Sequence, residues 1–248
     1  MTGTHQGRGV CLVIGAGDGL GASIARAFAR EGLRVCVTRR PRHIEAIDKL
    51  RDEIRAEGGE AHAFGLDARV EDDVVALIER IEREIGAIEV LVFNIGANVR
   101  FPIVETTTRV YSKVWEMAAL AGFLTSREAA RRMIERGRGA ILFTGATASV
   151  RGGAGFSAFA GAKHALRALA QSLARELGPK GIHVAHVVID GAIDGGFIRS
   201  IMPDAAERLA REAILVPDEI AKNYVWLYRQ KRSAWTFEMD LRPWSETW

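Results

Sequence analysis

The chain has 248 residues, of which 48% are hydrophobic and 26% are charged, and its formal net charge is +3. This size and composition favour one large core over two small ones, so we expect a single domain spanning 1–248. No apolar run reaches the roughly 18 residues that a membrane span needs, and the polar segment 1–8 does not resemble a secretory signal. The arginines are scattered, which argues against a nucleic-acid surface.

Cysteine and histidine usage excludes further classes. Cys11 and Cys36 both fall in apolar runs typical of buried strands, so we expect reduced core thiols and a cytoplasmic protein. The histidines are dispersed without the spacing of metal ligands, so we expect no metal site.

Strand and helix patterns alternate along the whole chain. The predicted strands are 10–14, 33–38, 61–65, 88–93, 139–144, 182–188 and 234–239. The predicted helices are 19–31, 43–57, 70–86, 104–136, 156–178 and 217–230. This alternation is typical of a doubly wound parallel sheet with helices on both faces. We therefore expect an α/β, Rossmann-like single domain with about seven strands.

The first predicted strand runs directly into a glycine-rich turn, which contains Gly15, Gly17, Gly19 and Gly21. Glycine has no Cβ, so the backbone can turn tightly and approach a ligand closely. From Leu20 onward, apolar residues recur at helical spacing, so the turn opens a helix. Free N–H groups and the positive end of the helix dipole suit a pyrophosphate, and the combination predicts a dinucleotide site.

Arg39 and Arg40 follow the second strand, where a sheet of this kind faces the adenosine ribose. Arginine suits a 2′-phosphate, so these residues favour NADP(H), with NAD(H) as the alternative. Two solvated arginines would explain the pair equally well. Asp18, in the glycine turn, would repel such a phosphate unless it pairs with one of the two arginines.

Later strand ends add further candidates. Asp67, after the third strand, either hydrogen-bonds the adenine or caps a turn. Asn94 and Gly96 end the fourth strand, and the glycine again lies where backbone and cofactor would meet. The segment 190–216 interrupts the alternation just past a strand's carboxyl end, where ligands bind in such sheets. It is either a substrate lid or an ordinary surface crossover.

These motifs, taken in order, resemble the short-chain dehydrogenase/reductase family along the length of the chain. The features that match are the turn ending Gly19-Leu20-Gly21, Asp67, Asn94-Ile95-Gly96, the helix with Lys163, and Asp190-Gly191-Ala192-Ile193 after a late strand. The resemblance implies a nicotinamide-dependent oxidoreductase acting on a small molecule as a homodimer or homotetramer. It also implies that Lys163, Gly191 and Ile193 contact the cofactor.

The sequence departs from the family's catalytic pattern. The family's active-site helix carries Tyr-x-x-x-Lys, and here Phe159 precedes Lys163. Ala146 stands where the family has a substrate-orienting serine, and Ala119 where it has an asparagine. Asp190 replaces a proline. Lys163 alone remains of the four catalytic positions, and the resemblance gives it a ribose-binding role.

Three interpretations stay open. An oxidoreductase could use another proton donor, and the candidates are Thr147, Ser149, Ser157, Tyr111 and Asp190, although the first two also fit a simple turn. A cationic iminium substrate would need little proton donation, with Phe159 as an apolar wall and Asp190 attracting the cation. The third interpretation is a catalytically degenerate nucleotide-binding protein or partner subunit.

Overall fold

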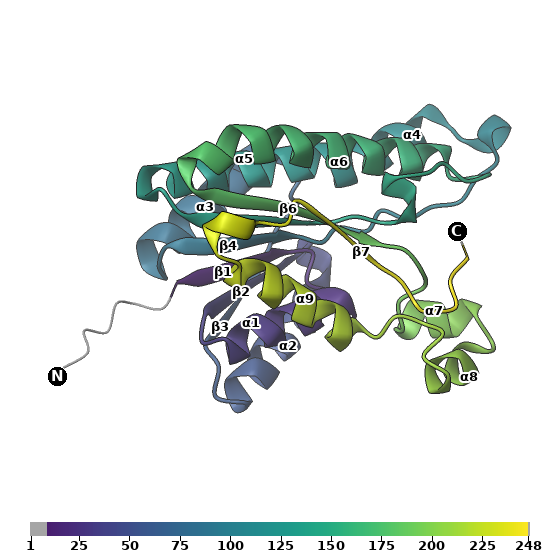
Figure 1. Ribbon diagram of the computed structural model, residues 1–248, viewed down its shortest axis with the longest axis horizontal. Helices are drawn as coiled ribbons and strands as arrows, with labels where there is room; N and C mark the ends of the chain where they lie inside the picture. Colours follow the sequence, from purple (N-terminus) through teal and green to yellow (C-terminus); the bar gives the residue numbers. More distant parts are fainter. Residues whose placement is uncertain (1–8, 248) are drawn as a thin grey trace.

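The computed structural model describes residues 9–247, and in this part of the chain seven parallel strands form one sheet in the order β3-β2-β1-β4-β5-β6-β7 (Figure 1). The strands are β1 (Val10–Ile14), β2 (Arg34–Arg39), β3 (Ala61–Gly65), β4 (Ile88–Phe93), β5 (Gly139–Thr144), β6 (Ile182–Ile189) and β7 (Glu238–Leu241). The strand order reverses between β1 and β4, and such a reversal opens a crevice at the carboxyl ends of these strands.

Helices cover both faces of this sheet (Figure 1). One face is covered by α1 (Leu20–Arg30), α2 (Ile44–Ala56) and α9 (Pro217–Arg229). The other is covered by α3 (Glu71–Glu84), α5 (Ala121–Arg136) and α6 (Ser157–Leu177). Three shorter helices are α4 (Thr108–Trp115), α7 (Gly196–Ile201) and α8 (Ala205–Ala210). No helix among the described residues is long and apolar enough to cross a membrane.

The central strand β1 shows why its sequence is apolar without interruption. Cys11 and Val13 pack in the core beneath α1 and α9, whereas Leu12 and Ile14 pack in the core on the opposite face. A strand buried on both faces has no polar alternation. Cys11 and Cys36 are free and buried, as predicted, and burial raises the pKa of both thiols.

The predicted helix 104–136 begins four residues too early and otherwise lies where expected. α4 begins at Thr108, where the Val110 amide donates to the Thr107 hydroxyl at 3.2 Å. A π-helical turn, Glu116–Leu120, then joins α4 to α5 without a break in the helix. A turn of this kind inserts one residue into a helix that otherwise continues, so we did not expect it from the sequence.

The predicted last strand, 234–239, begins too early. Arg232–Ala234 forms a 3-10 turn, and β7 begins only at Glu238. The Gln230 side chain holds Thr236 out of the sheet, because it accepts from the Thr236 amide at 2.7 Å and donates to the Thr236 hydroxyl at 2.8 Å. This local pairing delays the start of β7.

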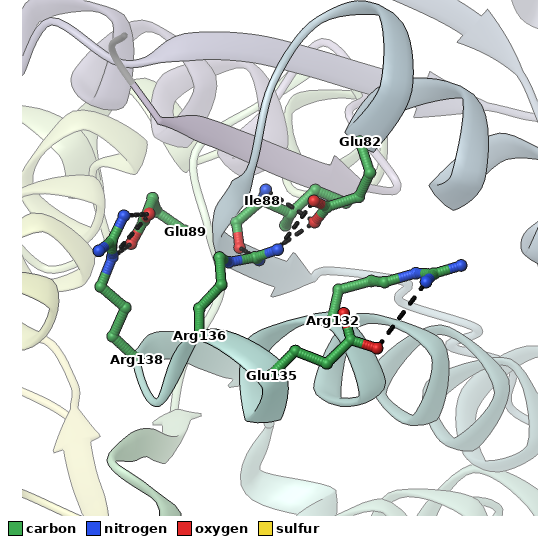
Figure 2. A network of polar contacts seen from close by, with 7 residues as sticks. All are labelled: Glu82, Ile88, Glu89, Arg132, Glu135, Arg136 and Arg138. Carbon is green, nitrogen blue, oxygen red and sulfur yellow. Dashed lines mark hydrogen bonds and ion pairs between the residues drawn. The ribbon is translucent and has the colours of Figure 1, made fainter. Parts of the chain in front are cut away.

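A polar network ties helices to strands at the amino ends of the sheet (Figure 2). Arg136, at the end of α5, donates to both carboxylate oxygens of Glu82 at 2.8 and 3.1 Å and to the Ile88 carbonyl at 2.8 Å. Glu82 also accepts from the Ile88 amide at 2.9 Å. Arg138 pairs with Glu89 of β4. The network therefore secures α3, α5 and β4 at the edge opposite the carboxyl ends.

Candidate active site

Two cavities adjoin at the carboxyl ends of the strands. The first has a volume of about 360 Å³ and is lined by residues that end or follow β1, β2, β3 and β4. The second has a volume of about 760 Å³ and is lined by residues that follow β1, β4, β5 and β6 and by the start of α6. Asn94, Ile95, Gly96 and Asn98 line both, so the two cavities form one cleft along the end of β4.

The glycine turn is held by close backbone packing. A Cβ at Gly21 would lie 2.6 Å from the Gly15 carbonyl oxygen and 2.8 Å from the Ala16 Cα, so only glycine fits here. At Gly19 no heavy atom lies within 4 Å of the same position, and this residue lines the second cavity. The Asn94 side chain donates to the Gly15 carbonyl at 3.0 Å and links the turn to β4. The open side of the turn therefore faces the cleft.

Arginines surround the first cavity. Arg39, Arg40 and Arg69 line it together with His43, and the Arg39 Cζ lies 3.7 Å from the Cβ position of Gly17. Burial lowers the pKa of Arg40, and Arg42 and Arg69 lower it further. Among the described residues Asp18 forms no ion pair with Arg39 or Arg40, so the pairing considered from the sequence does not occur there. This end of the cleft is therefore positively charged.

Asp67 is occupied by Arg69. Its two carboxylate oxygens accept from the Arg69 guanidinium at 2.6 and 2.9 Å, and one accepts from the Arg69 amide at 3.2 Å. These hydrogen bonds lower the pKa of Asp67, with the side-chain bond as the main cause. Asp67 therefore caps a turn and holds Arg69 at the cavity wall. Sequence reasoning missed Arg69 and His43, and the two-residue step from Asp67 was the available signal for Arg69.

Lys163 lies buried beside the second cavity. Its Nζ donates to the Thr144 carbonyl at 2.9 Å and to the Ile95 carbonyl at 3.1 Å. Burial lowers the pKa of Lys163 to about 8. The Nζ lies 5.9 Å from the centre of the Phe159 ring, because a four-residue step puts both side chains on one face of α6. The ammonium has three N–H groups and spends two on carbonyls, which leaves one for a ligand.

The other predicted catalytic positions are divided between the cavity and its surroundings. Ala146 and Phe159 line the second cavity. Ala119 is buried in the π-helical turn and is not part of either lining. The fully buried Ser149 hydroxyl accepts from the Ala146 amide at 3.1 Å, so it closes the turn and does not face the cavity. Ser157 and Tyr111 also lie outside both linings.

The half-buried Thr147 and the buried Asp190 form a polar pair. The Thr147 hydroxyl donates to the Asp190 carboxylate, which also pairs with Arg151 at 3.4 Å and with Arg242 at 3.3 Å. Thr147 and Arg151 line the second cavity, whereas Asp190 does not. Two guanidinium groups already face Asp190, so a role in attracting a cationic substrate does not fit this geometry.

The predicted cofactor residues otherwise gather along the cleft. Those that line one or both cavities are Gly15, Gly17, Asp18, Gly19, Leu20, Arg39, Arg40, Asp67, Asn94, Gly96, Lys163, Gly191 and Ile193. Gly21 is instead packed behind the turn. From the segment 190–216, residues between Gly191 and Ile198 form one wall of the second cavity. No group of metal-binding side chains occurs among residues 9–247.

A glycine turn at the switch point of a parallel sheet, with cations at both ends of the cleft, defines a nucleotide-binding α/β protein. The family described as short chain dehydrogenase matches residues 9–205, and the chain belongs to this family.

Individual relatives agree with this assignment. The crystal structure of a short-chain dehydrogenase from Rhodopseudomonas palustris is 50% identical, with a TM-score of 0.81, and the match covers 95% of this chain and 99% of that chain. The short-chain reductase protein NovJ of Streptomyces niveus is 31% identical over 92% of this chain and 90% of its own length. Zerumbone synthase of Zingiber zerumbet is 34% identical over 71% of this chain, which spans only 65% of that relative.

Proposed function

We propose that the protein is an NADP(H)-dependent oxidoreductase that moves a hydride to or from a small organic molecule without a tyrosine proton donor. Membership of the short-chain dehydrogenase family supports the oxidoreductase class. The two arginines at the end of β2 carry the cofactor assignment, because Arg39 and Arg40 line the first cavity and can donate charge-assisted hydrogen bonds to a 2′-phosphate. Asp67 does not oppose this charge, since its carboxylate is engaged by Arg69.

The residues of the cleft fit such a cofactor. The open position at Gly19 and the first amides of α1 would receive the diphosphate. The remaining N–H of Lys163 would bind a ribose hydroxyl. The nicotinamide, when bound, supplies or accepts the hydride. Phe159 contributes an apolar wall, which excludes water from the space beside Lys163.

The second cavity differs from the family's usual arrangement in where a proton is held. Phe159 and Ala146 carry no hydroxyl, and the Thr147 hydrogen is directed to Asp190. The Lys163 Nζ has a pKa of about 8, so it can hold or release a proton near neutral pH. We therefore propose that Lys163 handles the proton that the missing tyrosine would have handled, through the ribose hydroxyl to which its remaining N–H would donate.

Calorimetric titration with NADPH and NADH tests the cofactor assignment. NADPH is expected to bind more tightly, and Arg40→Ala should weaken NADPH by about tenfold or more while leaving NADH nearly unchanged. Arg42→Ala is the matched control, because Arg42 adds to the same field but does not line the cavity. Equal affinity for the two coenzymes would refute the preference, and binding of neither would refute the function.

A second candidate is a nucleotide-binding partner subunit without catalysis, which the missing hydroxyls at Phe159 and Ala146 favour. The double variant Ala146→Ser, Phe159→Tyr distinguishes the two, since both positions line the cavity. A general acid contributes roughly 10²–10⁴ in rate, so an active-site geometry should give a gain of that order for cyclohexanone with NADPH. No gain, with NADPH still bound, would support the non-catalytic subunit.

A further inference from the structure

Arg151 lines the second cavity, and most of the hydrogen-bond donors of its guanidinium are not used within the described part of the protein. It follows the turn Thr147–Ser149, and its amide donates to the Thr147 carbonyl at 3.1 Å. Its side chain is 44% exposed and lines the cavity. The guanidinium touches Asp190 through one nitrogen at 3.4 Å, near the long limit of a hydrogen bond, and has no other partner among residues 9–247. Most of its donors are therefore free.

The neighbouring charges do not require Arg151. Asp190 keeps the Thr147 hydroxyl and Arg242 as partners if Arg151 turns away. Asp194, which also lines the cavity, is neutralised by Arg199, which donates to both carboxylate oxygens at 2.7 Å. Of the remaining charged residues in the lining, Lys163 is bound to backbone carbonyls and Asp18 belongs to the glycine turn. Arg151 can thus turn to a ligand without stranding a buried charge.

The cavity that Arg151 lines also has apolar side chains in its wall. Phe156 and Phe159 line the same cavity, and Ile193 and Ile198 come from the segment after β6. Such a wall favours a hydrophobic molecule, whereas a guanidinium favours a planar carboxylate, which it can bind through two parallel hydrogen bonds. An amphipathic ligand satisfies both surfaces.

We propose that the substrate of the second cavity has an apolar body and a carboxylate that Arg151 binds. The inference rests on the proposed function, because it names the substrate class of the same cleft. Arg151 then determines specificity by fixing one end of the substrate, while the apolar wall holds the rest.

Benzoate and benzamide are suitable probes, because they share a ring and differ in charge. With the protein saturated in NADP⁺, benzoate should bind at least about tenfold more tightly than benzamide. Arg151→Gln should remove this difference by weakening benzoate alone. Arg100→Gln is the matched control: the Arg100 guanidinium lies 5.8 Å from the centre of the Phe156 ring and does not line the cavity, so it should change neither probe.

Two further measurements make the outcome decisive. Arg151→Lys keeps the charge but loses the bidentate geometry, so its benzoate affinity should fall between wild type and Arg151→Gln. NADPH binding is measured first on the wild-type protein and on every variant. If the wild-type protein does not bind NADPH, the proposed function is refuted. If NADPH binds normally, three results would overturn the carboxylate assignment alone. These are equal affinity for benzoate and benzamide, no binding of benzoate, and equal effects of Arg100→Gln and Arg151→Gln on benzoate affinity.

Discussion

The glycine turn allows stability and cofactor binding to be separated by two alanine substitutions. In Gly21→Ala the new methyl group would lie 2.6 Å from the Gly15 carbonyl oxygen, and both close neighbours are backbone atoms that cannot rotate away. Overpacking of this kind costs about 1–3 kcal/mol, which corresponds to a fall in Tm of roughly 3–9 °C for a domain of this size. NADPH affinity should fall as well, because the turn itself must shift.

Gly19→Ala is the matched change. Its methyl group would meet no protein atom within 4 Å and would project into the cleft. The Tm should therefore stay within about 1 °C of wild type, since a change without a steric or polar mechanism rarely alters stability. NADPH affinity should nevertheless fall by tenfold or more, on the order of 1.4 kcal/mol. Thermal unfolding and calorimetry measure the two effects, and full NADPH affinity in Gly19→Ala would refute the assignment of the turn to the diphosphate.

Two further predictions concern charged groups. Burial lowers the pKa of Lys163 from 10.5 to about 8, so between these values the unfolded chain holds a proton that the folded protein has released, and the free energy of unfolding rises with pH. Urea unfolding between pH 8 and 10.5 measures this rise, and in Lys163→Met it should be smaller by on the order of 3 kcal/mol. If the free energy of unfolding has the same slope against pH in the wild type and in Lys163→Met, the prediction is wrong. Arg136→Ala should cost about 1–3 kcal/mol with unchanged NADPH binding, because its side chain is 21% exposed and holds two partners, whereas Arg138→Ala, 59% exposed, should cost under about 1 kcal/mol. Equal losses in the two arginine variants would show that burial does not set the difference.

The sheet and its order of elements could be predicted because continuous apolar runs bounded by glycine mark strands buried on both faces. The starts and ends of β1 to β6 lie within one residue of the predicted limits. β7 is displaced because the pairing of Gln230 with Thr236 is a local side-chain effect that no periodicity records. The cytoplasmic location and the oligomeric state stay predictions.

The cleft was predictable only in part. The sequence places Arg39, Arg40 and Asn94 at the cleft, because they lie at the ends of predicted strands and parallel strands bring their carboxyl ends to one edge of the sheet. The surroundings of Asp190 were not predictable, since Arg151 and Arg242 come from distant parts of the chain. Because the sequence does not show these arginines beside Asp190, its carboxylate was expected to attract a cationic substrate.

The position of the network in Figure 2 has an evolutionary consequence. It lies at the far end of strands that are mostly five or six residues long, so roughly 17–20 Å of sheet separate it from the cleft. Mutations that reshape the cleft leave these anchoring contacts in place. Substitutions beside Lys163 can therefore change the chemistry of the cleft while the scaffold that supports it is kept.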